Sequence, residues 1–227
     1  MARNETGTST KTRILDAYRE LFYKQGYKKT TYIDIFNLTG INQGLITYYF
    51  KSKRAVAGLI HTEFRIQIKK AVEEYLTGLG GRYDLRIATS LEQIIYSRIK
   101  FSDENLKRFI YEISTLGIFM EYEISQLKHF WDLHVQEYGL PLSESEVKMI
   151  QVVNSSITWG ITTKMIEGYL EVTAEEFAAL RVRLMYQSLG LPEGEIRKVL
   201  EESYKLLGEM EISLRDYFQI RIRRKII

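Results

Sequence analysis

Apolar residues recur at helical spacing along almost the whole of this 227-residue chain, which contains only two prolines. Proline interrupts helix interiors and central strands, so its scarcity leaves room for long helices. Leu, Ile, Glu, Lys and Arg are plentiful, a composition that favours helices over many short strands bounded by turns. The sequence therefore predicts an all-α fold.

Composition narrows the class of protein further. Hydrophobic residues make up 45% of the chain and charged residues 27%, which is typical of a soluble globular protein with a sizeable core. Because cysteine is absent, disulfides, thiol catalysis and cysteine-based zinc sites are excluded. No segment resembles a signal peptide, and no run of about 18 apolar residues is present to span a bilayer. We expect a cytoplasmic protein.

Four helices are expected in the first 78 residues, after a polar stretch at 2–10 that we expect to be disordered. Their predicted N-caps are Ser9 or Thr10, Thr31, Asn42 and Ser52, and Gly26 and Gly40 end the first two helices. Beyond the glycine-rich loop at 77–82, helical patterns continue at roughly 83–100, 103–116, 118–138, 143–170, 174–189 and 193–218. The predicted architecture is a small helical head followed by a larger helical body.

Charge is divided unequally between these two parts. Residues 1–54 hold 10 Lys and Arg against 4 Asp and Glu, whereas the remaining residues hold 22 against 25. The head therefore has a net charge of +6 and the body −3. Such a division indicates a nucleic-acid-binding head on a body with another role.

The segment around Gly40 has the layout of a helix-turn-helix motif. A short helix, a tight turn with glycine at the left-handed position and a second short helix place the second helix in the major groove of DNA. Ile41, Ile46, Tyr49 and Phe50 fall where they would hold this second helix against the rest of the head. The polar residues between them are left facing outward.

These outward residues suit DNA recognition. Gln43 can form two hydrogen bonds with adenine, Gly44 allows close approach of the backbone, and Thr47 and Tyr48 offer hydroxyl groups. Lys53 adds a charge at a helix N-terminus, where phosphate is already favoured. The predicted DNA-binding residues are Thr31, Asn42, Gln43, Gly44, Leu45, Thr47, Tyr48 and Lys53.

Together these motifs resemble the tetracycline-repressor-like (TetR) family of transcription regulators. The resemblance covers roughly residues 10–60 and is carried by Gly26-Tyr27, Thr30-Thr31, Asp34-Ile35, Gly40-Ile41, Gly44, Ile46, Tyr49-Phe50 and Lys51-Ser52-Lys53. It implies a DNA-binding domain at residues 1–53 and an effector-binding and dimerisation domain at 54–227. It also implies a homodimer that binds a double-stranded operator, most simply as a repressor, and releases it when a small molecule binds.

Four positions depart from the family pattern. Phe36 stands where a small residue is usual, and it puts the crossing of the second and third helices in question. Thr47 stands where a tyrosine is common, so the phosphate contact is expected to pass to Tyr48. Gln43 replaces a usual cation, and Leu45 replaces a common threonine and would touch a thymine methyl group. We interpret these differences as selecting a particular operator.

The body offers weaker signals. By the resemblance, an effector pocket is expected among its middle helices, and the aromatic and histidine candidates for its lining are Tyr111, Phe119, Trp131, His134 and Trp159. An aromatic at helical spacing is, however, more often a packing residue than a ligand contact.

A dimer interface is expected on the helix that contains Gly160, because a glycine inside a helix costs about 1 kcal/mol and close approach of another helix would compensate. The last predicted helix would complete an intermolecular four-helix bundle through Ile196, Val199, Leu200, Tyr204, Leu207 and Met210. In the alternative interpretation both helices pack only within the monomer. We expect the basic C-terminal tail to be solvated.

Catalysis has no support in the sequence. His129 and His134 are five residues apart and do not share a helix face as zinc ligands would. Phosphate-binding and nucleophile-elbow motifs are absent, and adjacent pairs of glutamates are best explained as solvated surface. We expect neither an enzyme nor a cofactor. The remaining alternative is a helical interaction protein without DNA binding.

Overall fold

The computed structural model describes the backbone of residues 2–80, 84–126 and 128–225, and the side chains within these ranges except those of residues 2–8 and 123–129. The described elements are α1 (Ala2–Gln25), α2 (Tyr32–Thr39), α3 (Gln43–Phe50), α4 (Lys53–Gly78), α5 (Leu85–Ser102), α6 (Glu104–Thr115), α7 (Ile118–Gln126), α8 (Lys128–Glu137), α9 (Glu144–Ile166), α10 (Ala174–Ser188), α11 (Glu193–Gly208), β1 (Met210–Arg215) and β2 (Gln219–Arg224). Helices dominate, as predicted.

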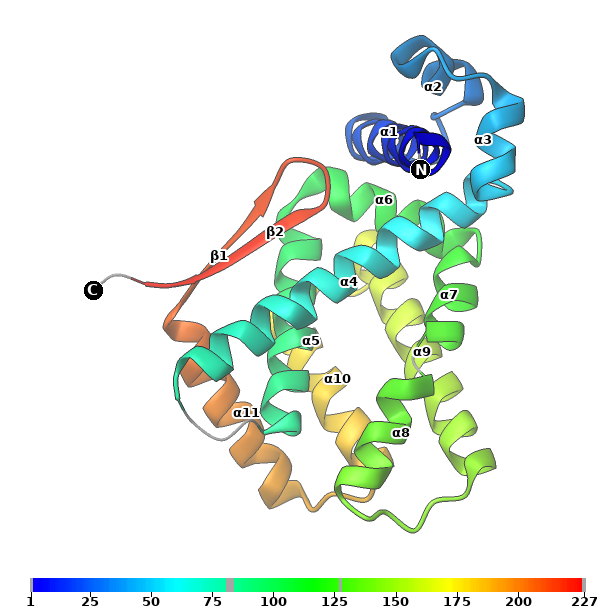
Figure 1. Cartoon of the computed structure of the whole chain (residues 1–227). Helices are drawn as coiled ribbons and strands as arrows, with labels where there is room; N and C mark the ends of the chain where they lie inside the picture. The colour runs from blue at the N-terminus through cyan, green and yellow to red at the C-terminus, as the bar shows by residue number, and fades with distance from the viewer. Residues whose placement is uncertain (1, 81–83, 127, 226–227) are drawn as a thin grey trace.

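The head consists of α1, α2 and α3, and the body of the helices from α5 onward (Figure 1). The long helix α4 begins at the head and runs diagonally across the body (Figure 1). One hydrophobic core is continuous through both parts, because Ile14 and Phe22 of the head belong to the same buried cluster as Ile60 of α4 and Leu91 of α5. A change in the body can therefore reach the head through packed side chains.

The ends of α2 and the starts of α3 and α4 follow the predicted caps. Thr31 and Asp34 form a reciprocal capping box at the start of α2, and Gly40 ends that helix with a left-handed φ of 70°. Asn42 Oδ1 accepts the Leu45 N–H at 3.0 Å, and Ser52 Oγ accepts the Ala55 N–H at 3.1 Å. Local hydrogen bonding thus fixes where α2, α3 and α4 begin.

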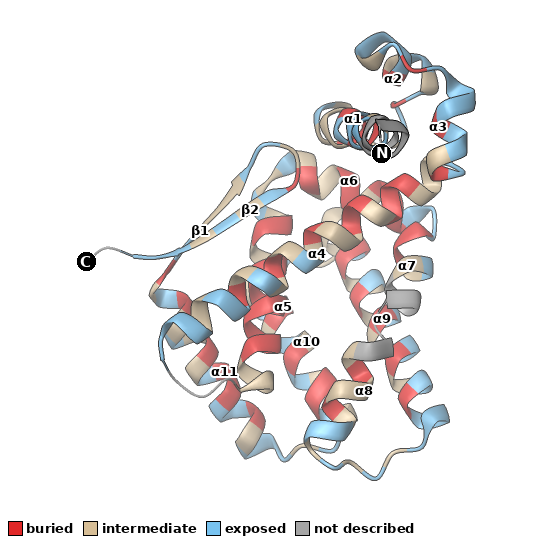
Figure 2. Cartoon of the chain, viewed as in Figure 1, coloured by how far each residue is buried: buried red, intermediate tan, exposed pale blue. Residues whose placement is uncertain are grey.

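Helix α5 lies at the centre of the body. Most of its residues are buried, and it packs against α4, α6, α10 and α11 (Figure 2). Its buried set includes polar residues as well as apolar ones, among them Glu92, Gln93, Ser97 and Lys100. Lys100 has a partner, because its ammonium donates to the Thr162 hydroxyl at 2.8 Å, whereas the Ser97 hydroxyl has none among the described residues.

One predicted segment differs from the structure near the start of the chain. Helix α1 begins at Ala2, so residues 2–10 are helical and neither Ser9 nor Thr10 is its N-cap. The helix predicted at 118–138 corresponds to α7 and α8, which lie on either side of residue 127, outside the described residues.

The end of the chain is the clearest correction. The last helix was predicted to continue to residue 218, but α11 ends at Gly208 and is followed by an antiparallel hairpin of β1 and β2. Ile212 pairs with Ile222 and Leu214 with Ile220, so the apolar residues alternate along both strands as in a half-buried hairpin. The basic tail belongs largely to β2 and packs beside α4.

The hairpin turn is seated against the head. Phe218 is buried, and its ring lies 4.8 Å from that of Phe109 and 5.6 Å from that of Tyr23. Gln67 of α4 donates to the Phe218 carbonyl at 3.3 Å and accepts the Ile220 N–H at 3.4 Å. The turn of the C-terminal hairpin therefore meets the end of α1 at the junction of head and body.

The apolar face of α11 is also placed differently from the prediction. Ile196, Val199 and Leu200 are buried in one cluster with Val182 and Tyr186 of α10. That face is used inside the monomer, so it does not provide the expected second dimerisation surface.

Candidate nucleic-acid interface and interior cavity

Helix α3 turns one face inward and the other to solvent. Ile41, Ile46 and Phe50 are buried in the core of the head and Tyr49 is half-buried, as predicted. The outer face is pale over most of its length in Figure 2. Its exposed residues are Asn42, Gln43, Gly44, Leu45, Thr47 and Tyr48, and the Tyr48 side chain is 79% exposed. The predicted reading residues are thus brought together on one accessible surface.

Two of the predicted DNA-binding residues also have structural tasks. The Asn42 carboxamide caps α3, and a Cβ added to Gly44 would lie 3.3 Å from Asn42 Oδ1. The Thr31 hydroxyl accepts from the Asp34 N–H and donates to the Asp34 carboxylate. Hydrogen bonds from the Thr31 N–H and hydroxyl lower the pKa of Asp34, so this cap stays charged at neutral pH.

Lys53 points into the head rather than to solvent. Its ammonium group donates to the carbonyls of Tyr27 and Thr30 at 3.0 and 2.8 Å and lies 4.3 Å from the centre of the Tyr27 ring. Burial lowers the pKa of Lys53. Two of the three ammonium donors therefore tie the start of α4 to the loop between α1 and α2.

Phe36 leaves the packing of the head undisturbed. Its side chain is 51% exposed on the surface of α2 and does not wedge between α2 and α3. Phe36 was expected to put the crossing of α2 and α3 in question, but it does not, because its ring extends into solvent.

Several contacts connect the head to the body. The Tyr23 hydroxyl donates to Asp103 at 2.6 Å, and the Lys28 N–H donates to Glu112 at 2.9 Å. At the start of α4, Arg54 donates to the Glu121 carboxylate at 2.7 Å and to the Leu116 carbonyl at 2.9 Å. These contacts join α1 and α4 to α6 and α7.

The predicted effector residues are spread over different parts of the body. Phe119 is buried beside His61, with ring centres 5.2 Å apart, and Tyr111 reaches Glu167 at the surface. Trp159 is partly exposed and donates to the Ser114 carbonyl, and His134 is buried and donates from Nδ1 to the Phe130 carbonyl. Of the five, Trp131 alone is among the described residues that line the interior cavity. His129 lies among the residues whose side chains are not described.

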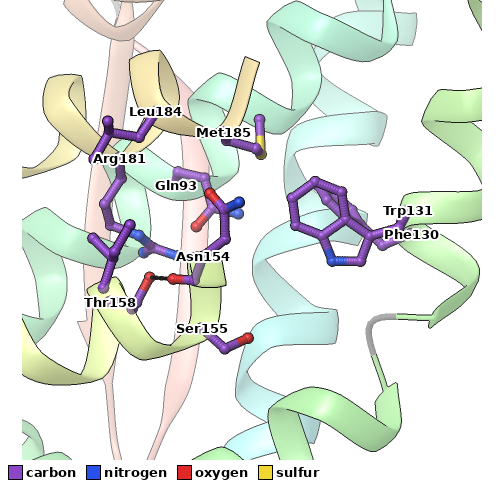
Figure 3. Close-up of a pocket in the computed structure, with 10 residues that line it drawn as sticks. Gln93, Phe130, Trp131, Asn154, Ser155, Thr158, Arg181, Leu184 and Met185 are labelled. Carbon is purple, nitrogen blue, oxygen red and sulfur yellow. Dashed lines mark hydrogen bonds between the residues drawn. The ribbon is translucent and has the colours of Figure 1, made fainter. Parts of the chain in front are cut away.

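The cavity lies between α5, α8, α9 and α10 (Figure 3). Its volume is about 30 Å³, which is room for roughly one or two water molecules. Its described lining consists of Gln93, Phe130, Trp131, Asn154, Ser155, Ile157, Thr158, Arg181, Leu184 and Met185. Sequence reasoning missed nine of these ten: eight are polar or aliphatic, whereas the candidates were aromatic residues and a histidine, and Phe130 was passed over although it is aromatic.

A polar cluster lies between α4, α5 and α9. His61 Nε2 and the Tyr96 hydroxyl are 3.0 Å apart, and the Lys100 ammonium donates to the Thr162 hydroxyl at 2.8 Å. Burial, with the charges of Arg65 and Lys100, lowers the pKa of His61 to about 3. The imidazole is therefore neutral at physiological pH.

None of the described helices combines the length and apolar character that a bilayer span requires. No group of three described His, Asp or Glu side chains is positioned to hold a metal ion.

Comparison with known proteins assigns the head to a described family. Residues 14–58 match the model for "Bacterial regulatory proteins, tetR family". An uncharacterized HTH-type transcriptional regulator of Lactococcus lactis subsp. lactis is 32% identical over 205 residues, which are 88% of this chain and 96% of that protein.

Solved structures support the same fold across head and body. RolR in complex with resorcinol has a TM-score of 0.61 at 16% identity, covering 87% of this chain and 95% of its own. Thermus thermophilus FadR, a TetR-family repressor in complex with lauroyl-CoA, has a TM-score of 0.57 at 15% identity. The match covers 81% of this chain and 96% of the FadR chain. At these identities the likeness concerns the fold alone.

Proposed function

This chain belongs to the tetR family of bacterial transcriptional regulators, and we propose that it is a repressor that binds a palindromic operator as a homodimer and is released by a small-molecule effector. The observation that carries the proposal is the outer face of α3. There Gln43, Thr47 and Tyr48 are exposed on a helix whose other side is buried in the head. A helix held in this way can enter a major groove with its polar side chains free.

We assign recognition of the base sequence to Gln43, and Leu45 would contact a thymine methyl group. The residues expected at the phosphates and neighbouring bases are Asn42, Gly44, Thr47, Tyr48 and Thr31. Lys53 acts by holding α4 on the head, since its ammonium already binds two carbonyls. Residues 1–53 form the DNA-binding part and 54–227 the effector-binding and dimerisation part. Such a regulator works in the cytoplasm, where its operator lies.

The homodimer is proposed through α9 and α10. Met149, Val152 and Val153 form an exposed apolar stripe on α9, and Leu180 is exposed on α10. In the monomer, a Cβ added to Gly160 of α9 would meet no atom of the described residues within 4 Å. The close approach expected at this glycine is therefore supplied by a second copy of the chain. Two copies would present their α3 helices to half-sites about 34–36 Å apart.

We propose that effector binding in the body causes release of DNA by moving α4. Gly58 of α4 is covered so closely by the Tyr122 ring of α7 that an added Cβ would overlap the ring. Arg54, one helical turn earlier, holds Glu121 and the Leu116 carbonyl. A ligand that moves α7 or α8 therefore shifts the start of α4 and, with it, the head. DNA and effector affinities must then oppose each other reciprocally. RolR and FadR were each solved with a small molecule bound, which supports an effector of this kind.

The experiment is DNase footprinting of the purified protein on the DNA flanking its own gene, with affinity measured as a function of salt. We expect one protected palindrome and an affinity that falls steeply as salt rises, because phosphate contacts release counterions. Absence of protection at every ionic strength, with no retention on heparin, would favour the helical interaction protein instead.

A further inference from the structure

The interior cavity has two walls of different chemistry (Figure 3). One wall is aromatic: the rings of Phe130 and Trp131 of α8 meet edge to face with centres 5.2 Å apart. The facing wall is polar and carries Asn154 and Thr158 of α9 with the Arg181 guanidinium of α10 beside them. A molecule between these walls would contact flat apolar surface on one side and a cation on the other.

Among the polar groups of the lining, Asn154 Nδ2 already donates to the Ile150 carbonyl and the Ser188 hydroxyl, whereas the Trp131 indole has an unused donor. Trp131 is only 2% exposed, and its Nε1–H has no hydrogen-bond partner among the described residues. Arg181 contributes guanidinium N–H groups, which only donate. The Gln93 carboxamide oxygen accepts from Arg65 Nη2 at 3.5 Å. A buried indole N–H without a partner is unfavourable, and an acceptor atom on a ligand would satisfy it.

Negative charge is missing from the described lining. None of the ten residues shown at the cavity is Asp or Glu. Glu92, although adjacent in sequence to Gln93, is influenced by Arg65 and Lys69 of α4, away from this lining. An acidic ligand would therefore meet donors and a cation at the cavity without a described carboxylate to repel it.

We propose that the effector is a small aromatic monocarboxylate. Its ring would lie against Phe130 and Trp131, and its carboxylate would accept from Arg181 and from Trp131 Nε1–H. Arginine binds carboxylates through two parallel hydrogen bonds, and this geometry favours an anion over a neutral amide of the same shape. The inference rests on the proposed function, because it names the effector of that same regulator.

The small size of the cavity indicates that the ligand must change the conformation of the body. At about 30 Å³ it holds water but not an aromatic acid, so binding requires the body to expand. Met185 lines the cavity with a flexible thioether side chain that can move aside. The compact body described here then corresponds to the DNA-binding form, and the acid stabilises a wider one.

The experiment uses the full-length protein and four acids: benzoate, phenylacetate, 4-hydroxybenzoate and cinnamate, each paired with its primary amide. Thermal stability and operator release are both measured with ligand at about 1 mM. We expect at least one acid to raise the melting temperature and release DNA, and its amide to bind roughly tenfold more weakly or worse, because a hydrogen bond to a charged group is the stronger one. Failure of all four acids, or equal binding of acid and amide, overturns the assignment.

Three variants locate the site. Arg181→Gln should abolish the response to the acid, whereas Arg183→Gln, on the same helix but exposed and paired with Glu193, should respond like the wild type. Trp131→Phe keeps a ring and removes the N–H, so it should weaken binding several-fold even if Arg181→Gln folds poorly. The proposed site is contradicted if the single variants Trp131→Phe and Arg181→Gln both respond to the acid as the wild type does. It is also contradicted if Arg183→Gln loses the response.

The thermal measurement contains no DNA, so it separates the two proposals. A protein that footprints an operator but ignores the acids would retain the proposed function and lose this inference. A protein that binds an acid but protects no DNA would lose the proposed function, and the carboxylate site would then belong to a regulator of another kind.

Discussion

Gln43 lies at the first position of α3 with its carboxamide exposed, and no described hydrogen bond within the protein engages it. Gln43→Ala should therefore reduce discrimination at one base pair by about 1–3 kcal/mol, because it removes an amide suited to adenine. Competition binding against operator fragments with single substitutions measures the effect. Lys53→Ala is the comparison: it frees the loop between α1 and α2 and should weaken all fragments alike. Unchanged discrimination in Gln43→Ala would remove this residue from the reading role.

Glu92 is a buried acid on α5 whose burial raises the pKa from 4.5 to about 7. The unfolded chain ionises this group above pH 4.5 while the folded chain keeps it protonated up to about pH 7. The folded state therefore binds more protons in this window, and stability falls as pH rises through it. At pH 8 the cost reaches about 3 kcal/mol, at roughly 1.4 kcal/mol for each unit of pKa shift.

Glu92→Gln should remove that cost. Urea unfolding at pH 5 and pH 8 should show the variant losing less stability between the two values than the wild type does. Glu74→Gln, an exposed position on α4, is the matched control and should leave the difference as it is. An identical pH dependence for Glu92→Gln and wild type would show that Glu92 ionises normally in the fold.

Among the helices, the contact of α4 with α7 depends on one missing side chain. Alanine in place of a glycine inside a helix ordinarily stabilises it by about 1 kcal/mol. At Gly58 the added methyl group would overlap the Tyr122 ring, so Gly58→Ala should destabilise the protein and force α7 away from α4. Gly78→Ala, in the same helix but with no atom within 4 Å of the added Cβ, should not destabilise.

Thermal melts of both variants, with operator affinity measured alongside, check this prediction. Replacing Tyr122 by a smaller residue in the Gly58→Ala background should restore part of the stability. If Gly58→Ala proves as stable as Gly78→Ala, α7 does not press on α4 as described, and the proposed route to the head is lost.

The elements also show where sequence reasoning succeeds. Helix ends that depend on local caps, such as Thr31 with Asp34 and Asn42 with Leu45, were predicted correctly because donor and acceptor lie within three residues. The exposed face of α3 followed from the same local periodicity. The hairpin was missed because its period-two pattern at Ile212, Leu214, Ile220 and Ile222 is short and directly follows a strongly amphipathic helix.

The cavity was mostly beyond the reach of the sequence for a different reason. Gln93, Trp131, Asn154 and Arg181 come from four helices, and only the angles at which these pack bring the side chains together. No spacing within one helix signals such a site. Trp131 was found because it is aromatic, whereas Arg181 resembles any surface arginine in sequence.

For the molecule as a whole, dimerisation through α9 and α10 can be tested at Gly160. A Cβ added to Gly160 meets no described atom within 4 Å inside the monomer, so we expect Gly160→Trp to fold but to dissociate into monomers and bind its operator more weakly. Gly194→Trp on α11 is the matched control, since an added Cβ there also meets no atom within 4 Å. Sedimentation velocity distinguishes the species. A dimer of wild-type stability in Gly160→Trp would place the interface elsewhere.

The aromatic contact between Phe218 and Tyr23 joins residues near opposite ends of the polypeptide. During synthesis Tyr23 leaves the ribosome long before Phe218 has been added, so this contact forms late. Until then the head is held on the body by the contacts of Tyr23 with Asp103 and of Lys28 with Glu112. The hairpin therefore reinforces a seat of the head that other side chains have already set.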